Sequence, residues 1–348
     1  MYIFFKLYYT AKICHSWSGN LVSIANWSEF YLNEGLTVFL ESKISDRLFG
    51  TPASEFQVYC RSKALKKAID LYGINHEFTK LRPCLRDGVD PDDAFSSVPY
   101  DKGYAFVRFL EGECGGDKHF MPFLKKYFDT YAFQSIATDH LRELYEKEFP
   151  SVIIDWNAWT TLPGFPLVPP LFDTSLSGDC IKWGGLILNS VSTSSSSSVL
   201  SVIEELALST SEWNDMQRIA FFEIISERNE GSPIFSKEVV ERIGMAMRLI
   251  KDSNPIHCAR PLSLNKELVH RWFMFVNIQW SLSPATAYSN HLSSLQEFLA
   301  SVGRLKFTRS LYRSWASAQP IESKEFFIRH AHNYHPVTRK MLSRDFGM

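Results

Sequence analysis

Apolar residues recur at a helical period along most of this chain of 348 residues. Between Trp27 and Leu48 they return every three or four positions, which places them on one face of an α-helix, and Gly50 favours its end. Residues 74–98 are predicted to be irregular. The same helical pattern predicts further helices over residues 53–72, 99–113, 117–131 and 138–148. Because strand-like alternation is nearly absent, we predict a mainly α fold.

Four prolines within residues 161–170 predict a stiff, extended linker, because proline fixes its backbone and lacks an N–H donor. We place the domain boundary there, between a first domain of residues 1–160 and a second of residues 171–348. The serine-rich run Ser192–Ser198 is predicted to be a flexible loop. Helical patterns then succeed one another over residues 199–209, 212–228, 236–251, 264–281, 285–302, 306–317, 321–332 and 336–345.

The second domain is predicted to be a solenoid-like layer of helix pairs. Successive amphipathic helices bury their apolar faces against their neighbours when they stack in this way. Within it, Ser236 has the side-chain oxygen that caps a helix N-terminus, and Gly303 suits a helix end.

Composition and charge argue against several kinds of partner. The net charge of −1 gives no electrostatic reason to expect nucleic acid or an anionic membrane, so we predict neither. No run approaches the ~20 apolar residues of a membrane span, and the first ten residues lack the pattern of a signal peptide. The six cysteines are scattered without a Cys-x-x-Cys pair, which indicates free thiols and a cytoplasmic protein.

The candidate chemistry lies near the N-terminus. Eighteen residues separate His15 from Glu34, the spacing at which zinc peptidases of the gluzincin class place their second histidine and their glutamate ligand. Such a site needs His-Glu-x-x-His on one helix, because residues four apart share a face and both imidazoles then reach one metal. Ala11 and Lys12 occupy the first two positions of that motif. The first ligand and the general base are therefore missing.

Seven short segments extend this resemblance to the C-terminus. In chain order they resemble the C-terminal half to two-thirds of the leukotriene A(4) hydrolase and aminopeptidase B family. The resemblance implies the helical lobe of a thermolysin-like catalytic domain, followed by a C-terminal α-helical superhelix. It also implies a zinc aminopeptidase and epoxide hydrolase that acts on peptide N-termini or a lipid epoxide. The segments are His-Ser-Trp-Ser-Gly-Asn (15–20), Leu-Asn-Glu-Gly (32–35), Phe-Thr-Lys-Leu (78–81), Ser-Ser-Val-Pro-Tyr-Asp-Lys-Gly (96–103), Asp-Trp-Asn-Ala-Trp (155–159), Gly-Arg-Leu-Lys-Phe-Thr-Arg (303–309) and His-Pro-Val-Thr (335–338).

The resemblance also implies parts that this sequence lacks. The family carries a β-rich N-terminal domain, a small catalytic-domain sheet and a Gly-x-Met-Glu-Asn loop that holds the substrate amine. No Met-Glu-Asn occurs here, and the similarity stops at about Ile13. We expect an N-terminally truncated chain, produced by an alternative start or a gene-model artefact. Side chains that the missing parts would cover, including Trp17, Phe30 and Tyr31, are expected to meet water.

The resemblance assigns metal-site roles to three residues. His15 and Glu34 correspond to the second and third zinc ligands, and Glu41 to a carboxylate that orients a ligand histidine. Because two ligands half fill a tetrahedral site and Lys12 brings a cation, we expect zinc to bind weakly or not at all. Glu41 is alternatively a solvated acid near Lys43 and Arg47.

Substrate-facing roles fall on further residues. Tyr100 matches a tyrosine that donates a hydrogen bond to the developing oxyanion, while Phe95 stands where the family has a second tyrosine. Asp92 matches an acid that directs water in epoxide opening, and is alternatively part of an acidic loop. Arg304 and Lys306 match a basic pair that receives the substrate carboxylate, and are otherwise an ordinary solvated pair at a helix start.

Two hypotheses remain. In the first, the chain derives from a bifunctional zinc aminopeptidase and leukotriene A(4) epoxide hydrolase and is itself catalytically inactive. In the second, it is a non-catalytic helical scaffold or partner-binding remnant. We favour the first. His330, His332 and His335 lack an acidic or thiol partner, so we predict surface residues there rather than a metal cluster.

Overall fold

The computed structural model describes residues 10–85, 89, 94–193, 196–226, 235–249, 266–282 and 291–348. The chain divides into two compact units, Tyr2–Leu176 and Ser177–Met348, called here the N-terminal and the C-terminal unit. The domain boundary predicted at residues 161–170 stays a prediction. Its first residues bond to the N-terminal unit, because Leu162 O accepts from Lys102 Nζ and Gly164 N donates to Thr79 Oγ1.

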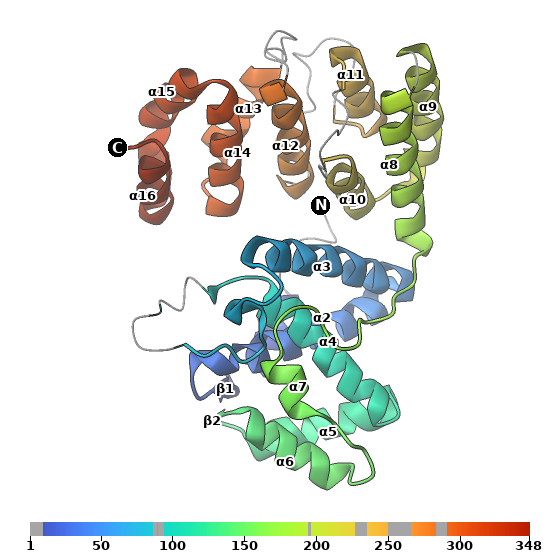
Figure 1. Ribbon diagram of the computed structural model, residues 1–348, viewed down its shortest axis with the longest axis vertical. Coiled ribbons are helices and arrows are strands. Elements are labelled where there is room, and N and C mark those ends of the chain that lie inside the picture. Colours follow the sequence, from blue (N-terminus) through green and yellow to red (C-terminus); the bar gives the residue numbers. More distant parts are fainter. Residues whose placement is uncertain are drawn as a thin grey trace. The chain divides into compact units, whose positions relative to one another are not determined.

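The N-terminal unit is mostly helical (Figure 1). Its central helix α2 packs against both α3 and α4. A two-stranded parallel sheet pairs Val22 with Gln134, and residues 10–15 form a short helix. The five longer helices were predicted from the sequence, whereas the two strands and α7 were not. The elements are β1 (Val22–Ile24), η1 (Trp27–Glu29), α2 (Phe30–Phe49), α3 (Thr51–Tyr72), η2 (Glu77–Thr79), α4 (Val98–Glu113), α5 (Asp117–Thr130), β2 (Gln134–Ile136), α6 (Thr138–Glu148) and α7 (Trp156–Thr161).

Two glycines hold α2 and α4 at contact distance. A Cβ added to Gly35 would lie 2.7 Å from the carbonyl carbon of Gly103, and one added to Gly103 would lie 3.0 Å from Cα of Gly35. Only glycine permits so close an approach of two backbones. Glu34 directly precedes the first glycine and Tyr100 lies one helical turn before the second, so the crossing brings these two side chains to one region.

A buried polar contact fixes the start of α2. Glu29 is fully buried, and its Oε2 accepts hydrogen bonds from the backbone N (3.1 Å) and Oγ1 (2.5 Å) of Thr138, while Arg82 Nη2 lies 2.9 Å from its Oε1. Tyr31 OH lies 2.8 Å from Thr138 Oγ1, and Tyr31 is 0% exposed. The expectation that Tyr31 meets water was therefore wrong, because α6 covers it. Trp17 is 45% exposed, as expected.

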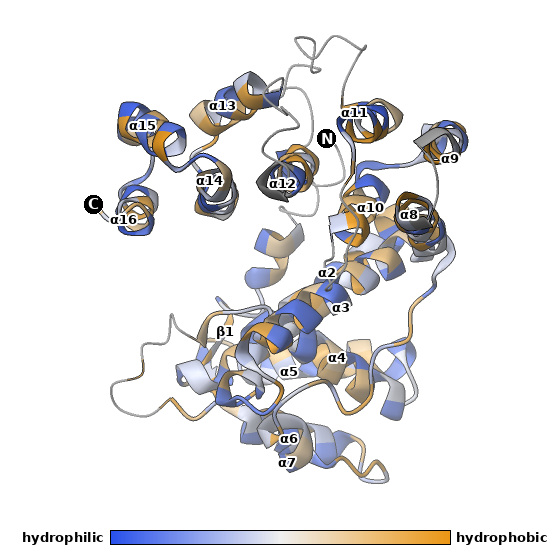
Figure 2. Cartoon of the chain, turned by 45° about the horizontal axis from the view of Figure 1, so that its top comes forward, coloured by the Kyte–Doolittle hydropathy of each residue, from blue (hydrophilic) through white to orange (hydrophobic). Residues whose placement is uncertain are grey.

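The C-terminal unit consists of helices alone in its described part. Helix α9 packs against α11, α10 against α12, and α12 against α14, so each contacts the next but one, as stacked helix pairs do. Figure 2 shows hydrophobic and hydrophilic residues on each of α11, α14 and α16, the mark of amphipathic helices. The predicted mainly α fold is confirmed. The helices are α8 (Ser175–Thr193), α9 (Ser196–Ser209), α10 (Asp215–Ser226), α11 (Lys237–Ala246), α12 (Lys266–Leu282), α13 (Leu292–Ser301), α14 (Leu305–Ala318), α15 (Pro320–His330) and α16 (Pro336–Asp345), with short 3-10 turns η4 (Thr210–Glu212) and η8 (Ala331–Asn333).

The loop predicted at Ser192–Ser198 was wrong for the residues that the structure describes. Helix α8 continues to Thr193 and α9 begins at Ser196. Serine costs a helix only a few tenths of a kcal/mol relative to alanine, and the apolar face that follows is buried at Val199 and Ile203. Packing therefore overrides the composition. Among the described helices, none is long and apolar enough to cross a membrane.

Candidate functional site

The structure brings His15 and Glu34 together. His15 ends the short helix of residues 10–15, and its Nδ1 donates to the carbonyl oxygen of Ser18 at 3.1 Å, with Thr37 Oγ1 at 3.3 Å. This bond assigns the ring proton to Nδ1 and leaves the lone pair on Nε2. His15 Nε2 lies 3.5 Å from Glu34 Oε2. Two acceptor atoms, Nε2 of His15 and Oε2 of Glu34, thus face each other, and a cation or a proton placed between them would interact with both.

Glu34 is a buried carboxylate under competing electrostatic influences. Burial and the negative charge of Glu41 raise the pKa of Glu34 to about 7, while the positive charge of Lys12 acts in the opposite direction. Its Oε2 is buried without a hydrogen-bond partner. The side chain is therefore placed to receive a positively charged or hydrogen-bond-donating group.

The donor atoms at this point do not fit zinc. A protein zinc site takes at least three protein ligands in a tetrahedral arrangement. His15 and Glu34 supply two, Ala11 supplies no donor atom, and Lys12 brings a positive charge that acts on Glu34. Within the described ranges, no group of three His, Cys, Asp or Glu side chains is positioned to hold a metal ion.

Glu41 has a different partner from the one expected. Its Oε2 accepts a hydrogen bond from Arg61 Nη2 at 2.7 Å, and Arg61 Nη1 donates to Asp101 Oδ1 at 3.3 Å. Glu41 is buried, so the alternative of a solvated acid near Lys43 was wrong; Lys43 pairs with Glu111 instead. Sequence reasoning missed Arg61, and no local spacing reveals it, because its partners lie 20 and 40 residues away.

Tyr100 lies beside Glu34 and an aromatic cluster. Burial and the nearby Glu34 carboxylate raise the pKa of Tyr100 above its usual range. The ring of Phe30 meets that of Tyr100 edge-on with centroids 5.9 Å apart, and Phe95, which is 61% exposed, lies 6.1 Å away. These aromatic residues adjoin a cavity of about 260 Å³ lined by Trp27, Phe30, Phe78, Lys80, Leu81, Pro83, Leu85, Ala94, Phe95 and Pro99. Asp92 lies outside the described residues.

The basic pair predicted to receive the substrate carboxylate, Arg304 and Lys306, belongs to the C-terminal unit. Arg304 is exposed just before α14, and its guanidinium lies 5.9 Å from the ring centroid of Phe307. The side chain of Lys306 lies outside the described part of the structure. Nearby, His330 Nδ1 donates to the carbonyl oxygen of Phe326 at 2.9 Å, and His335 Nδ1 accepts from Val337 N at 3.3 Å. These two histidines therefore have local structural contacts.

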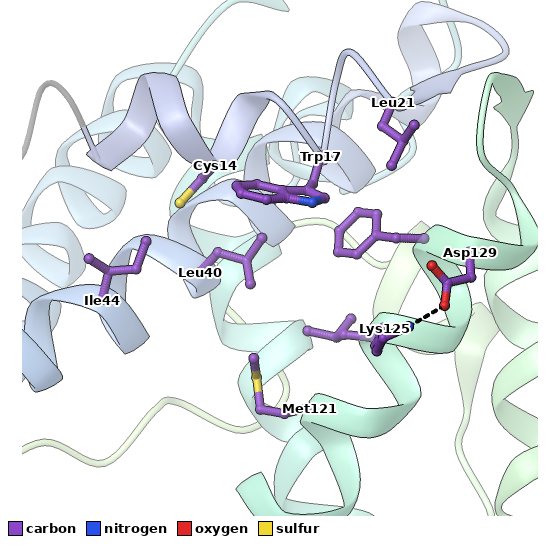
Figure 3. A pocket seen from close by; sticks show the side chains of 10 residues that line it. Cys14, Trp17, Leu21, Leu40, Ile44, Met121, Lys125 and Asp129 are labelled. Carbon is purple, nitrogen blue, oxygen red and sulfur yellow. Dashed lines mark hydrogen bonds and ion pairs between the residues drawn. The ribbon is translucent and has the colours of Figure 1, made fainter.

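A second cavity of the N-terminal unit has a volume of about 360 Å³ (Figure 3). Trp17 and Cys14 face Leu40 and Met121 across it, and Lys125 pairs with Asp129 at its edge. The remaining lining residues are Leu21, Ile44, Leu124 and Phe128. The cavity is almost entirely apolar and includes none of the predicted site residues.

Two protein families match the chain. Residues 10–159 match the Peptidase family M1 domain, and residues 260–346 match the leukotriene A4 hydrolase C-terminal domain. The chain is 34% identical over 351 residues to leucine aminopeptidase 2 of Yarrowia lipolytica, covering 96% of this chain and 50% of that protein. It is 29% identical over 341 residues to leukotriene A-4 hydrolase of Xenopus laevis, covering 96% of this chain and 51% of that protein.

Solved structures of leukotriene A4 hydrolases also superpose on almost the whole of this chain. The structure of yeast LTA4 hydrolase in complex with bestatin superposes with a TM-score of 0.84 at 26% identity, covering 98% of this chain and 54% of that chain. A native LTA4 hydrolase structure from Saccharomyces cerevisiae gives a TM-score of 0.80 at 27% identity, with the same coverage of 98% and 54%. The chain therefore spans about half the length of the relatives that it matches.

Proposed function

Since the chain belongs to the M1 peptidase family of leukotriene A4 hydrolases and aminopeptidases, we propose that it carries an aminopeptidase-type site that does not hydrolyse substrate with the residues present. The observation behind this proposal is the pairing of His15 with Glu34 at 3.5 Å, while Ala11 and Lys12 hold the other two motif positions. Members of this family are typically zinc-dependent. Hydrolysis needs an activated water and a base for its proton, and alanine and lysine at these positions supply neither.

The site residues that are present are suited to bind a substrate. The Tyr100 hydroxyl is available to donate to a substrate oxygen, and Glu34 offers a carboxylate to a positively charged amino group. The apolar cavity beside Phe30 suits an apolar side chain of a peptide or the alkyl chain of a lipid. Peptides are the substrate class that fits best. We keep lipid epoxide as a second substrate class, with the predicted roles of Asp92 in water direction and of Arg304 with Lys306 in carboxylate binding.

The test measures zinc content and turnover of the purified chain. We expect substoichiometric zinc by elemental analysis after dialysis and no hydrolysis of an aminoacyl anilide, because two ligands and no base remain. Stoichiometric zinc together with turnover would show the proposal to be wrong.

A repaired variant supplies the positive control. Ala11→His with Lys12→Glu restores the His-Glu-x-x-His pattern, so we expect zinc occupancy to rise. Adding Glu34→Gln to this variant should return the occupancy to the low value, because one ligand charge is lost. Turnover need not return, since the sequence contains no Met-Glu-Asn segment to hold the substrate amine.

A further inference from the structure

Three buried carboxylates crowd together in the N-terminal unit. The side chains of Glu34 and Glu41 on α2 are 9% and 10% exposed, and that of Asp101 on α4 is 5% exposed. Glu41 raises the pKa of Glu34, and Asp101 raises that of Glu41, so the three charges act on one another. A buried carboxylate without a positive partner is strongly unfavourable. Glu41 and Asp101 are therefore expected to have a positively charged partner nearby.

This partner is Arg61 on α3. A single guanidinium bridges Glu41 on α2 and Asp101 on α4, at 2.7 Å and 3.3 Å. The planar fork of arginine suits this role, because its two terminal nitrogens reach two carboxylates at once. Arg61 thus connects all three helices around the crossing of Gly35 and Gly103.

Lys12 lies three residues before His15, and its positive charge lowers the pKa of Glu34. Ala11 and Cys14 are three residues apart and share a face of that helix, and the Glu41 charge helps burial to raise the pKa of Cys14 to about 12. Alanine at position 11 has no donor atom for a carboxylate, and the partner of Glu41 in the structure is Arg61.

We propose that Arg61, by bridging Glu41 and Asp101, supplies the positive charge that these buried carboxylates require, so this part of the site is a metal-independent centre of ion pairs. This inference rests on the proposed function, since it takes the site to be of the M1 type. Arg61 is a positioning residue in this centre, because it holds α2 against α4 through Glu41 and Asp101. The N-terminal unit consequently keeps its structure without zinc.

The first experiment removes the charge of Arg61 in the full chain. Hydrogen exchange of α2 and α4, measured by mass spectrometry in the presence of a chelator, should show protection falling at least about tenfold in Arg61→Met. Arg61→Lys should recover part of the protection, and Lys67→Met, an exposed control on the same helix, should change nothing. Zinc added to the wild-type chain should leave protection unchanged. Unchanged exchange in Arg61→Met would overturn the proposal.

The second experiment asks whether Arg61 competes for Glu41. In the Ala11→His, Lys12→Glu background, Arg61→Met frees that carboxylate to hold the introduced imidazole. The zinc Kd, measured against a chromophoric chelator, should fall about tenfold, and Lys67→Met in the same background should leave it unchanged. A Kd that stays equal or rises in Arg61→Met would overturn the proposed role of Arg61 and would leave the proposed function untouched. Stoichiometric zinc in the wild-type chain would instead overturn the proposed function.

Discussion

The N-terminal unit buries more ionisable side chains than the described part of the C-terminal unit. The N-terminal unit encloses several ionisable groups, among them Glu29, Glu41, Asp101 and Lys102. In the described part of the C-terminal unit, the largest fully buried side chains are aromatic, namely Trp272, Trp315 and Tyr312. Both units thus bury large aromatic side chains, and the N-terminal unit adds a larger set of buried ionisable groups.

Lys102 shows how the N-terminal unit uses buried charge as a cross-link. Its side chain is buried, and Nζ donates to the carbonyl oxygens of Thr79 and Leu162, both at 2.9 Å. Burial lowers the pKa of Lys102 to about 8. One ammonium thus fastens η2 to the segment that follows α7.

The C-terminal unit makes the corresponding links with neutral groups. Tyr312 OH lies 2.9 Å from Tyr334 OH, and the latter donates to the carbonyl oxygen of Leu299 at 3.1 Å. Rings of Trp315 and Phe326 pack around them with centroids 5.6 Å apart. Neutral links of this kind respond little to pH or salt.

The largest expected effect comes from removing a buried charge in the first unit. Glu29→Ala leaves the Thr138 N–H unpaired and Arg82 without its partner, so we expect the N-terminal unit to lose about 3–5 kcal/mol of unfolding free energy. Pulse-labelling hydrogen exchange along a urea series reads each unit separately. The exposed Glu205→Ala in α9 is the control, and should stay within about 0.5 kcal/mol. Equal losses in the two variants would contradict the comparison.

The second effect is an opposite response of the two units to pH. Burial raises the pKa of Asp101 to about 6, so the folded N-terminal unit holds a proton that the unfolded chain has released, and its stability falls as pH rises from about 4 to 6. Burial lowers the pKa of His291 to about 4, so the C-terminal unit gains stability as pH rises from about 4 to 6.5. Each pH unit over which the two states differ by one proton is worth about 1.4 kcal/mol.

The same urea series at several pH values checks these slopes. Asp101→Asn should reduce the slope of the N-terminal unit between pH 4 and 6 and leave the part that belongs to Glu34, whose pKa is also raised, and His291→Leu should flatten the response of the C-terminal unit. Slopes of the same sign in both units of the wild-type chain would refute the assignment.

The smallest effect tests the close helix contacts of both units. A Cβ at Gly103 meets the backbone of Gly35 at 3.0 Å, and one at Gly184 meets Cγ2 of Ile224 at 2.5 Å, on a β-branched side chain that a helix holds in one rotamer. We expect Gly103→Ala and Gly184→Ala each to cost its unit about 1–3 kcal/mol. Gly112→Ala, with nothing within 4 Å of its new Cβ, is the matched control on α4 and should be neutral or slightly stabilising. A cost for Gly103→Ala or Gly184→Ala no larger than that of Gly112→Ala would contradict the close contact at that glycine.

Local signals were sufficient to predict most helices and the family. Gly50 and Gly73 follow α2 and α3, and Ser236 caps α11 through Val239 N, as these residue types favour. The strands β1 and β2 are three residues each and too short to show a period. Helix α8 was missed because its glycines lower helix propensity, and its contact with α10 becomes visible only in three dimensions.

The candidate site was likewise predictable from the sequence only in part. The spacing of His15 and Glu34 predicted a pair, and the structure places them together. Arg61 had no local signal, since its role depends on how α2, α3 and α4 cross. Tyr31 was placed wrongly, because the residue that bonds to it, Thr138, lies 107 positions further along the chain. Chemistry that follows a short motif was predictable, and chemistry assembled by tertiary contact was not.

The bond between Glu29 and Thr138 has a consequence for the order of folding. It spans 109 residues, so the start of α2 is fixed only after a long loop has closed. The tyrosine contacts of the C-terminal unit span 22 and 35 residues. Because chains with short-range contacts fold faster, we expect the C-terminal unit to gain exchange protection first during refolding. The half of the chain that carries the site would then be the last to form.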